Sequence, residues 1–210
     1  MWWGVGLVLW GLGAWCAGTS YQAFSYELKC AGRETCSWTT WWEIAYLILS
    51  AASVNAMLAA EAQASCTGRW RTALTYYAWA NTVMYSVVVL SGAWLLHARL
   101  ISFEGLLVAV SPGIVLLAAL GGWRYARYGL REDRELVVRW CLLGIIVGAY
   151  FTYLRLGVTS WLWARGLWFS ENDVLHIGLL GWMAHLAVSV APSVADAPAP
   201  SFNHARDLDH

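Results

Sequence analysis

An acidic residue and a histidine lie three positions apart at the start of the last apolar stretch, in Asn172-Asp173-Val174-Leu175-His176. Residues i and i+3 share one face of an α-helix, so this pair can present an oxygen and a nitrogen to one metal ion. Zinc accepts both ligand types and needs one or two further protein ligands beside a water molecule. Asp173 and His176 are therefore the first candidate metal ligands, and zinc is the predicted cofactor.

Three more polar residues are candidates for the same site. Glu43 and Ser50 belong to an earlier apolar stretch, and His97 ends the next one. Ionisable residues at membrane depth are costly and usually functional. We predict His97 as a further metal ligand, with Glu43 as the alternative. Glu43 and Ser50 are the candidate catalytic residues, and Ser50 is predicted to orient a substrate or an oxyanion.

Each candidate also has a structural explanation. Ser170 followed by Asp173 is close to a capping box, and an acid in the first turn favours the helix dipole. His176 is equally explained as a hydrogen-bonded histidine at the membrane interface. The polar side chains around Glu43 follow one helical face, which also suits hydrogen bonds between helices. They belong to Glu43, Tyr46, Ser50 and Ser53.

The composition indicates that the solvent of this chain is lipid. Hydrophobic residues make up 60% and charged residues 12% of the chain, with a mean hydropathy of +0.52. Soluble domains carry roughly 45–50% hydrophobic residues and about 25% charged residues. The 16 Trp residues suit the headgroup level of a bilayer. Because the net charge is zero and no basic tract occurs, we predict the lipid bilayer as partner and no nucleic acid.

Six stretches are long and apolar enough to position these residues, since a membrane span needs ~20 residues. In lipid the backbone must pair its own polar groups, so each stretch is predicted to be a helix. The stretches are 3–26, 38–62, 72–97, 104–124, 135–156 and 172–191. We expect an all-α, polytopic membrane helix bundle of about six transmembrane helices, or seven. Residues 1–191 form one domain in this prediction, and residues 192–210 form a disordered tail.

The distribution of Lys and Arg predicts the orientation. With six spans, eight of the 13 basic residues fall on the side that holds both termini, and five fall on the other side. The positive-inside rule then places both termini in the cytoplasm, in the cell (inner) membrane. Cys30 and Cys36 lie on the opposite side, where a disulfide between them is one of two open alternatives.

Several other features are predicted to be structural. Gly4, Gly11 and Gly18 recur every seven residues, and Gly144 and Gly148 form a Gly-x-x-x-Gly pair. Both patterns predict seams along which another helix packs closely. Glu61 and the Arg-rich connection between the fourth and fifth stretches are predicted to be ordinary cytoplasmic flanks.

Two short segments resemble a known superfamily. Trp42-Glu43-Ile44-Ala45 through Ser50, and Asn172 through His176, resemble the early acidic helix and the late histidine element of alkaline ceramidases, adiponectin-type receptors and their bacterial relatives. Members are seven-helix membrane proteins regarded as metal-dependent hydrolases. The late His-x-x-x-His pair of the family is absent, and only His176 matches it. The resemblance implies an intramembrane metal-dependent hydrolase of a lipid-like amide or ester.

The residues also support functions other than hydrolysis. In a small transporter or ligand-binding bundle, the polar faces of the second and third stretches, Pro112 and the Trp-rich segment 157–170 would line a cavity. The polar face of the third stretch consists of Tyr77, Asn81 and Tyr85. In the third interpretation the chain is a non-catalytic subunit of a membrane complex. Whether the protein is an enzyme therefore stays open at this point.

Overall fold

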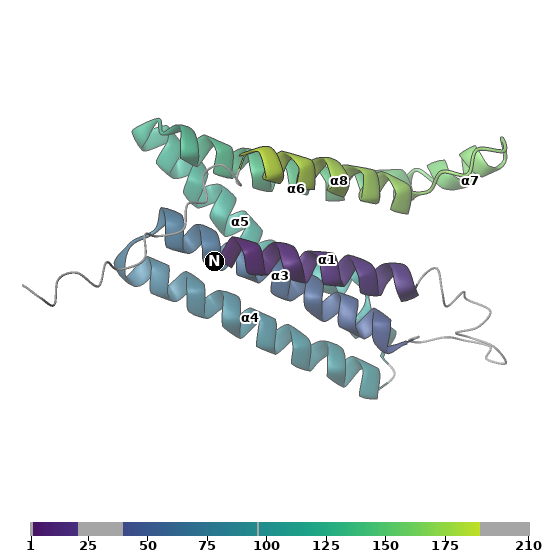
Figure 1. Cartoon of the computed structure of the whole chain (residues 1–210). Coiled ribbons are helices and arrows are strands. Elements are labelled where there is room, and N and C mark those ends of the chain that lie inside the picture. The colour runs from purple at the N-terminus through teal and green to yellow at the C-terminus, as the bar shows by residue number, and fades with distance from the viewer. Residues whose placement is uncertain (1, 21–39, 96, 190–210) are drawn as a thin grey trace, which may run out of the picture. The chain divides into compact units, whose positions relative to one another are not determined.

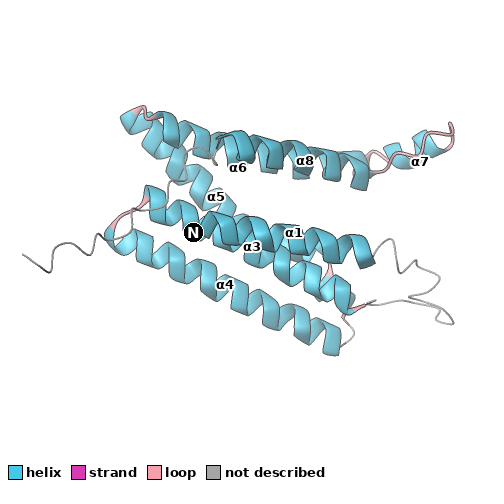
Figure 2. Cartoon of the chain, viewed as in Figure 1, coloured by secondary structure: helices cyan, strands magenta, loops and turns pink. Residues whose placement is uncertain are grey.

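The structure, a computed structural model, describes residues 2–20, 40–95 and 97–189. They fall into two compact units, Met1–Trp140 and Cys141–His210, which are taken one at a time below. Helices account for nearly all of the described residues, and Figure 2 shows no strand among them. The prediction of an all-α fold is confirmed. The single-domain prediction for residues 1–191 stays a prediction.

Every predicted membrane stretch coincides with a long helix. The helices are α1 (Trp2–Gly18), α3 (Trp41–Ser65), α4 (Gly68–Trp94), α5 (Phe103–Tyr128), α6 (Arg131–Arg155) and α8 (Glu171–Ser189), joined in part by η2 (Ala98–Ile101) and α7 (Val158–Trp163) (Figure 1). Among the described residues, α3, α5 and α6 are long and apolar enough to cross a membrane. These three helices identify the chain as a membrane protein.

Helix α3 is the centre of the first unit, because it packs against α1, α4 and α5. Its second half is buried on all sides, from Ser53 to Ala62. This part of the helix is rich in alanine, and small side chains let neighbouring helix backbones come close. The hydroxyl of Ser53 donates a 2.7 Å hydrogen bond to the carbonyl of Gly6 in α1, so part of the predicted polar face holds two helices together.

The close contact between α1 and α3 uses a different pair of glycines from the predicted one. A Cβ placed on Gly6 would lie 2.8 Å from Cγ of Met57, and one on Gly13 would lie 3.3 Å from Oγ of Ser50. Within this unit no atom lies within 4 Å of a Cβ placed on Gly4, Gly11 or Gly18. The prediction that Gly4, Gly11 and Gly18 form the seam is therefore wrong. Successive residues of a helix are turned by about 100°, so Gly4 and Gly6 point to different faces.

The second unit contains the end of α6, the short α7 and α8. Its close helix contact is at Gly178 of α8, where a Cβ would lie 2.6 Å from Cγ2 of Ile146. A Cβ placed on Gly144 or Gly148 meets no atom of the unit within 4 Å, so their predicted packing seam is not formed inside this unit and stays a prediction. The Trp-rich segment forms α7 and a turn with exposed Trp161, Trp163 and Trp168. The predicted part of this segment in lining a cavity stays a prediction.

Three predictions fall on residues outside the described ranges. They are the C-terminal part of the first stretch, the Cys30 and Cys36 pair, and the tail 192–210.

Candidate functional site

The predicted late site belongs to the start of α8 in the second unit. The backbone amide and hydroxyl of Ser170 donate to Oδ2 of Asp173 at 2.7 and 2.8 Å, and the Asp173 amide donates to Oγ of Ser170 at 3.4 Å. This reciprocal pattern is a capping box with aspartate at its third position. The structural explanation of Asp173 is therefore confirmed, because its carboxylate is held at the end of the helix.

His176 is exposed and lies on the same helix, one turn further along. Its Nδ1 is 2.6 Å from the carbonyl oxygen of Asn172. Because a carbonyl only accepts, Nδ1 carries the proton, and Nε2 of the neutral ring is left as the acceptor. A histidine held in this way has one nitrogen that is chemically able to bind a metal.

The other three predicted residues belong to the first unit. Glu43 is half-buried in the first turn of α3, and Ser50 is half-buried where α3 meets Gly13 of α1. His97 is exposed and precedes η2, where its amide donates to the Gly92 carbonyl. The first turn of α3 and the end of α4 lie at the same end of this unit (Figure 1).

The five predicted residues are divided between the two units, with Glu43, Ser50 and His97 in the first and Asp173 and His176 in the second. In the described ranges, no group of three or more His, Cys, Asp and Glu side chains is placed to hold a metal ion. Asp173 is engaged as a helix cap, and a zinc site requires at least three protein ligands. Zinc and the hydrolase function stay predictions.

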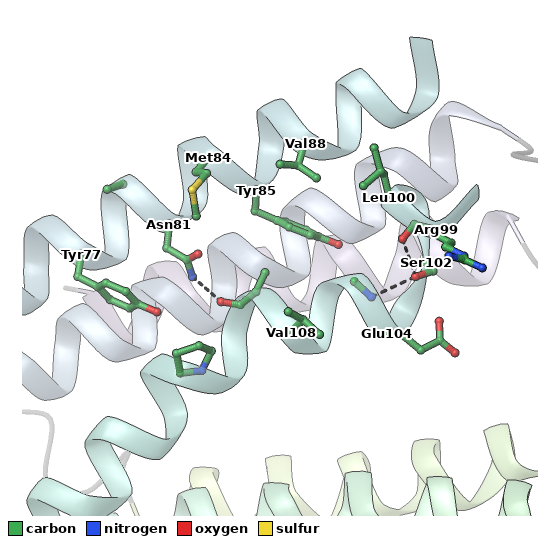
Figure 3. Close-up of a pocket in the computed structure, with 14 residues that line it drawn as sticks. Tyr77, Asn81, Met84, Tyr85, Val88, Arg99, Leu100, Ser102, Glu104 and Val108 are labelled. Atoms are coloured by element: carbon green, nitrogen blue, oxygen red, sulfur yellow. Dashed lines mark hydrogen bonds between the residues drawn. The ribbon is translucent and has the colours of Figure 1, made fainter. Parts of the chain in front are cut away.

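The most developed site in the first unit is a groove between α4 and α5 (Figure 3). Its volume is about 970 Å³, at the upper end of the roughly 300 to 1,000 Å³ typical of small-molecule sites. The groove follows α4 from Tyr77 to Val88, a stretch along which the helix rises by about 17 Å. The facing wall consists of Glu104, Gly105, Val108, Ala109 and Pro112 from α5.

The walls of the groove are mainly apolar and its long side is open. Met84 is 62% and Val108 73% exposed, although both are large hydrophobic side chains. They come from opposite walls, so an apolar molecule can enter between them. The prediction that Tyr77, Asn81, Tyr85 and Pro112 line a cavity is confirmed, whereas the Glu43 face of α3 does not contribute.

Asn81 ties the groove to α3 and α5. Its side-chain amide donates to the Ala109 carbonyl of α5 at 2.9 Å and to Oδ1 of Asn55 in α3 at 3.2 Å. The Asn55 amide in turn donates to Oγ1 of Thr82 at 2.9 Å. Pro112 removes a backbone donor from α5 close to Ala109. The network therefore fixes three helices around the groove.

One end of the groove is polar. Ser102 caps α5, because its hydroxyl accepts from the Gly105 amide at 3.1 Å and donates to the Arg99 carbonyl at 3.0 Å. The side chains of Arg99 and Glu104 are exposed beside it, one positive and one negative (Figure 3). The groove thus has an apolar length and a charged mouth.

The first unit also contains two ion pairs whose carboxylates are buried. Arg139 of α6 binds Glu61 of α3, and Nε of Arg124 lies 2.9 Å from Oδ1 of Asp133. Glu61 is 4% and Asp133 1% exposed. The prediction that Glu61 is an ordinary solvated flank is wrong, since its charge is paired and enclosed. In the Arg-rich connection Arg124 is paired with a buried carboxylate, whereas Arg127, Arg131 and Arg134 are exposed, as predicted.

The mouth of the groove could not be recognised from the sequence. Arg99 and Ser102 stand in a short connection and carry no motif spacing. The one available signal was the sequence Ser102-Phe103-Glu104-Gly105, in which a serine before a helix with an acid in its first turn indicates a helix start. This signal locates the start of α5, but it does not reveal that α4 forms the other wall of the groove.

Comparison with protein-family models, with curated proteins and with solved structures finds no match for this chain. Its function is therefore argued from the site.

Proposed function

We propose that this is a multi-pass membrane protein that binds an amphiphile, with the ligand's apolar chain along the groove between α4 and α5. The observation that carries the proposal is the form of the groove, which is open and apolar along its length and charged at one end. An amphiphile has the same division between chain and headgroup. Lipid surrounds a membrane protein on all sides, so a groove that opens between Met84 and Val108 is reached directly from the bilayer.

Several helices support the multi-pass arrangement. α3, α5 and α6 meet the length and composition of a span. α4 is 27 residues long and turns large apolar side chains outward. They include Trp70, Trp79, Val83, Met84, Val87, Leu90 and Trp94. Such a surface is stable in lipid but costly in water. The proposal keeps the cell membrane and the cytoplasmic position of both termini as predicted from the basic residues.

Photolabelling tests the binding proposal. The protein is reconstituted in vesicles containing a diester phosphatidylethanolamine with a photoreactive group in one acyl chain, and labelled residues are mapped by peptide mass spectrometry. We expect Met84 and Val108 to be labelled several-fold more than Val83 and Val87, because all four are exposed but only the first two line the groove.

A matched pair of variants on α4 provides the control. Ala80→Trp fills the groove and is expected to reduce labelling of Val108 at least fivefold. Val83→Trp adds the same indole three residues away, outside the groove, and should leave the labelling pattern unchanged. Equal labelling of groove and non-groove residues in the parent protein would contradict the proposal.

The hydrolase with zinc is the second candidate, supported by the free Nε2 of the His176 tautomer. It predicts stoichiometric zinc in the purified protein and loss of that zinc in His176→Ala. Metal analysis by mass spectrometry measures both, with His204→Ala as the control for adventitious binding. If the zinc content is the same in parent and His176→Ala, His176 is not a ligand.

A further inference from the structure

The hydroxyl of Tyr85 is a buried polar group in the wall of the groove. Tyr85 is 4% exposed, and its oxygen has no hydrogen-bond partner in the part of the chain that the structure describes. Figure 3 shows the ring lying along the groove, with the hydroxyl directed toward the end where Ser102 and Arg99 lie. The large majority of buried side-chain polar atoms in proteins are hydrogen-bonded, so this hydroxyl requires an explanation.

We infer that the Tyr85 hydroxyl donates a hydrogen bond to the ester or amide carbonyl of the bound amphiphile. This inference rests on the proposed function and names the ligand class within it. A hydrocarbon chain alone would leave the buried hydroxyl unpaired, which is unfavourable because the group has lost its hydrogen bonds to water. In an acyl lipid the carbonyl lies between the headgroup and the hydrocarbon chain. Tyr85 has the corresponding position in the groove, between the charged mouth and the apolar length.

The charges at the mouth of the groove also indicate which kind of lipid headgroup can bind there. Arg99 and Glu104 present one positive and one negative group on either side of the Ser102 cap. A zwitterionic headgroup, with a phosphate beside Arg99 and an ammonium beside Glu104, complements both charges. The ligand predicted by the whole groove is therefore a zwitterionic acyl ester or amide lipid.

The inference is tested with two lipids that differ only at the carbonyl. The full-length protein in vesicles is labelled with the photoreactive diester phosphatidylethanolamine, in competition with either its unlabelled diester or its unlabelled diether analogue. We expect the diester to compete about fivefold to tenfold better, the ratio that a net hydrogen bond of about 1–1.4 kcal/mol produces. Tyr85→Phe should still bind the probe but should lose this preference, whereas Tyr76→Phe, exposed and outside the groove, should keep it.

A stability measurement separates ligand binding from a structural role. Since the hydroxyl has no partner among the described residues, we expect it to contribute nothing to the lipid-free fold. Tyr85→Phe should therefore melt at or above the temperature of the parent protein after delipidation. A Tm lowered by several degrees would show a structural partner and overturn the inference.

The remaining outcomes are also distinct. Equal competition by diester and diether in the parent protein overturns the carbonyl assignment and leaves the proposed function standing. No specific labelling of the groove overturns both. If a photoreactive amino acid in place of Met84 crosslinks to a second copy of the chain rather than to lipid, a second copy occupies the groove, and this too overturns both.

Discussion

Glu61→Leu is expected to lower the free energy of unfolding by about 3–5 kcal/mol, the usual cost of removing one partner of a buried ion pair. Glu61 is the ion-pair partner of Arg139, and both side chains are enclosed by the first unit. The Arg139 guanidinium also lies 5.9 Å from the centre of the Trp3 ring. Without the carboxylate, the positive charge of Arg139 stays buried and loses the anion that offsets it. Unfolding in detergent micelles, followed by tryptophan fluorescence, measures the change.

Two further variants test whether the effect comes from the unpaired charge. In the double variant Glu61→Leu/Arg139→Met most of the lost stability should return, because replacing a whole buried pair by apolar residues is often neutral or favourable. Glu135→Leu removes the carboxylate of the exposed Arg131–Glu135 pair and should cost less than about 1 kcal/mol. If the double variant is as unstable as Glu61→Leu, burial of an unpaired charge is not the cause.

Gly6→Val is expected to destabilise the contact between α1 and α3 by about 1–3 kcal/mol, the typical cost of overfilling a packed site. A Cβ on Gly6 would lie 2.8 Å from Cγ of Met57 and 3.3 Å from the backbone oxygen of Ser53. The methionine side chain can move, but the backbone of α3 cannot move without shifting the helix. The displacement would also stretch the hydrogen bond from Ser53 to the Gly6 carbonyl.

Gly4→Val is the matched control, on the same helix and two residues away. No atom of the unit lies within 4 Å of a Cβ at Gly4, so this variant should leave the unfolding transition within about 0.5 kcal/mol of the parent. Thermal unfolding of both variants in micelles provides the comparison. Equal destabilisation by the two would contradict the assignment of Gly6 to the seam.

Local patterns were predictable from the sequence because their causes are local. The apolar length of each stretch was enough to predict a helix, since a backbone in lipid must satisfy its polar groups within the segment. The cap formed by Ser170 and Asp173 was visible as a spacing of three residues, because the interaction closes within one helical turn. The same locality explains why capping competed with the metal hypothesis for Asp173.

The glycine seam required the tertiary structure. Gly4 with Gly11 and Gly6 with Gly13 have the same seven-residue spacing, so periodicity alone cannot choose between them. The choice depends on which face of α1 meets α3, and that is decided by Ser53 and Met57 on the other helix.

The buried ion pairs and the groove are decided by packing alone. Glu61 and Arg139 are 78 residues apart, and each resembles a solvated flank until the helices enclose it. Tyr77, Asn81 and Tyr85 could be recognised as one face of a helix, which identifies a seam. This seam becomes a groove only because α5 contributes Val108 and Pro112 as a second wall. The sequence therefore determined a membrane protein made of helices, and the tertiary structure decided which polar groups are paired and where a ligand has room, because both depend on the distance between separate helices.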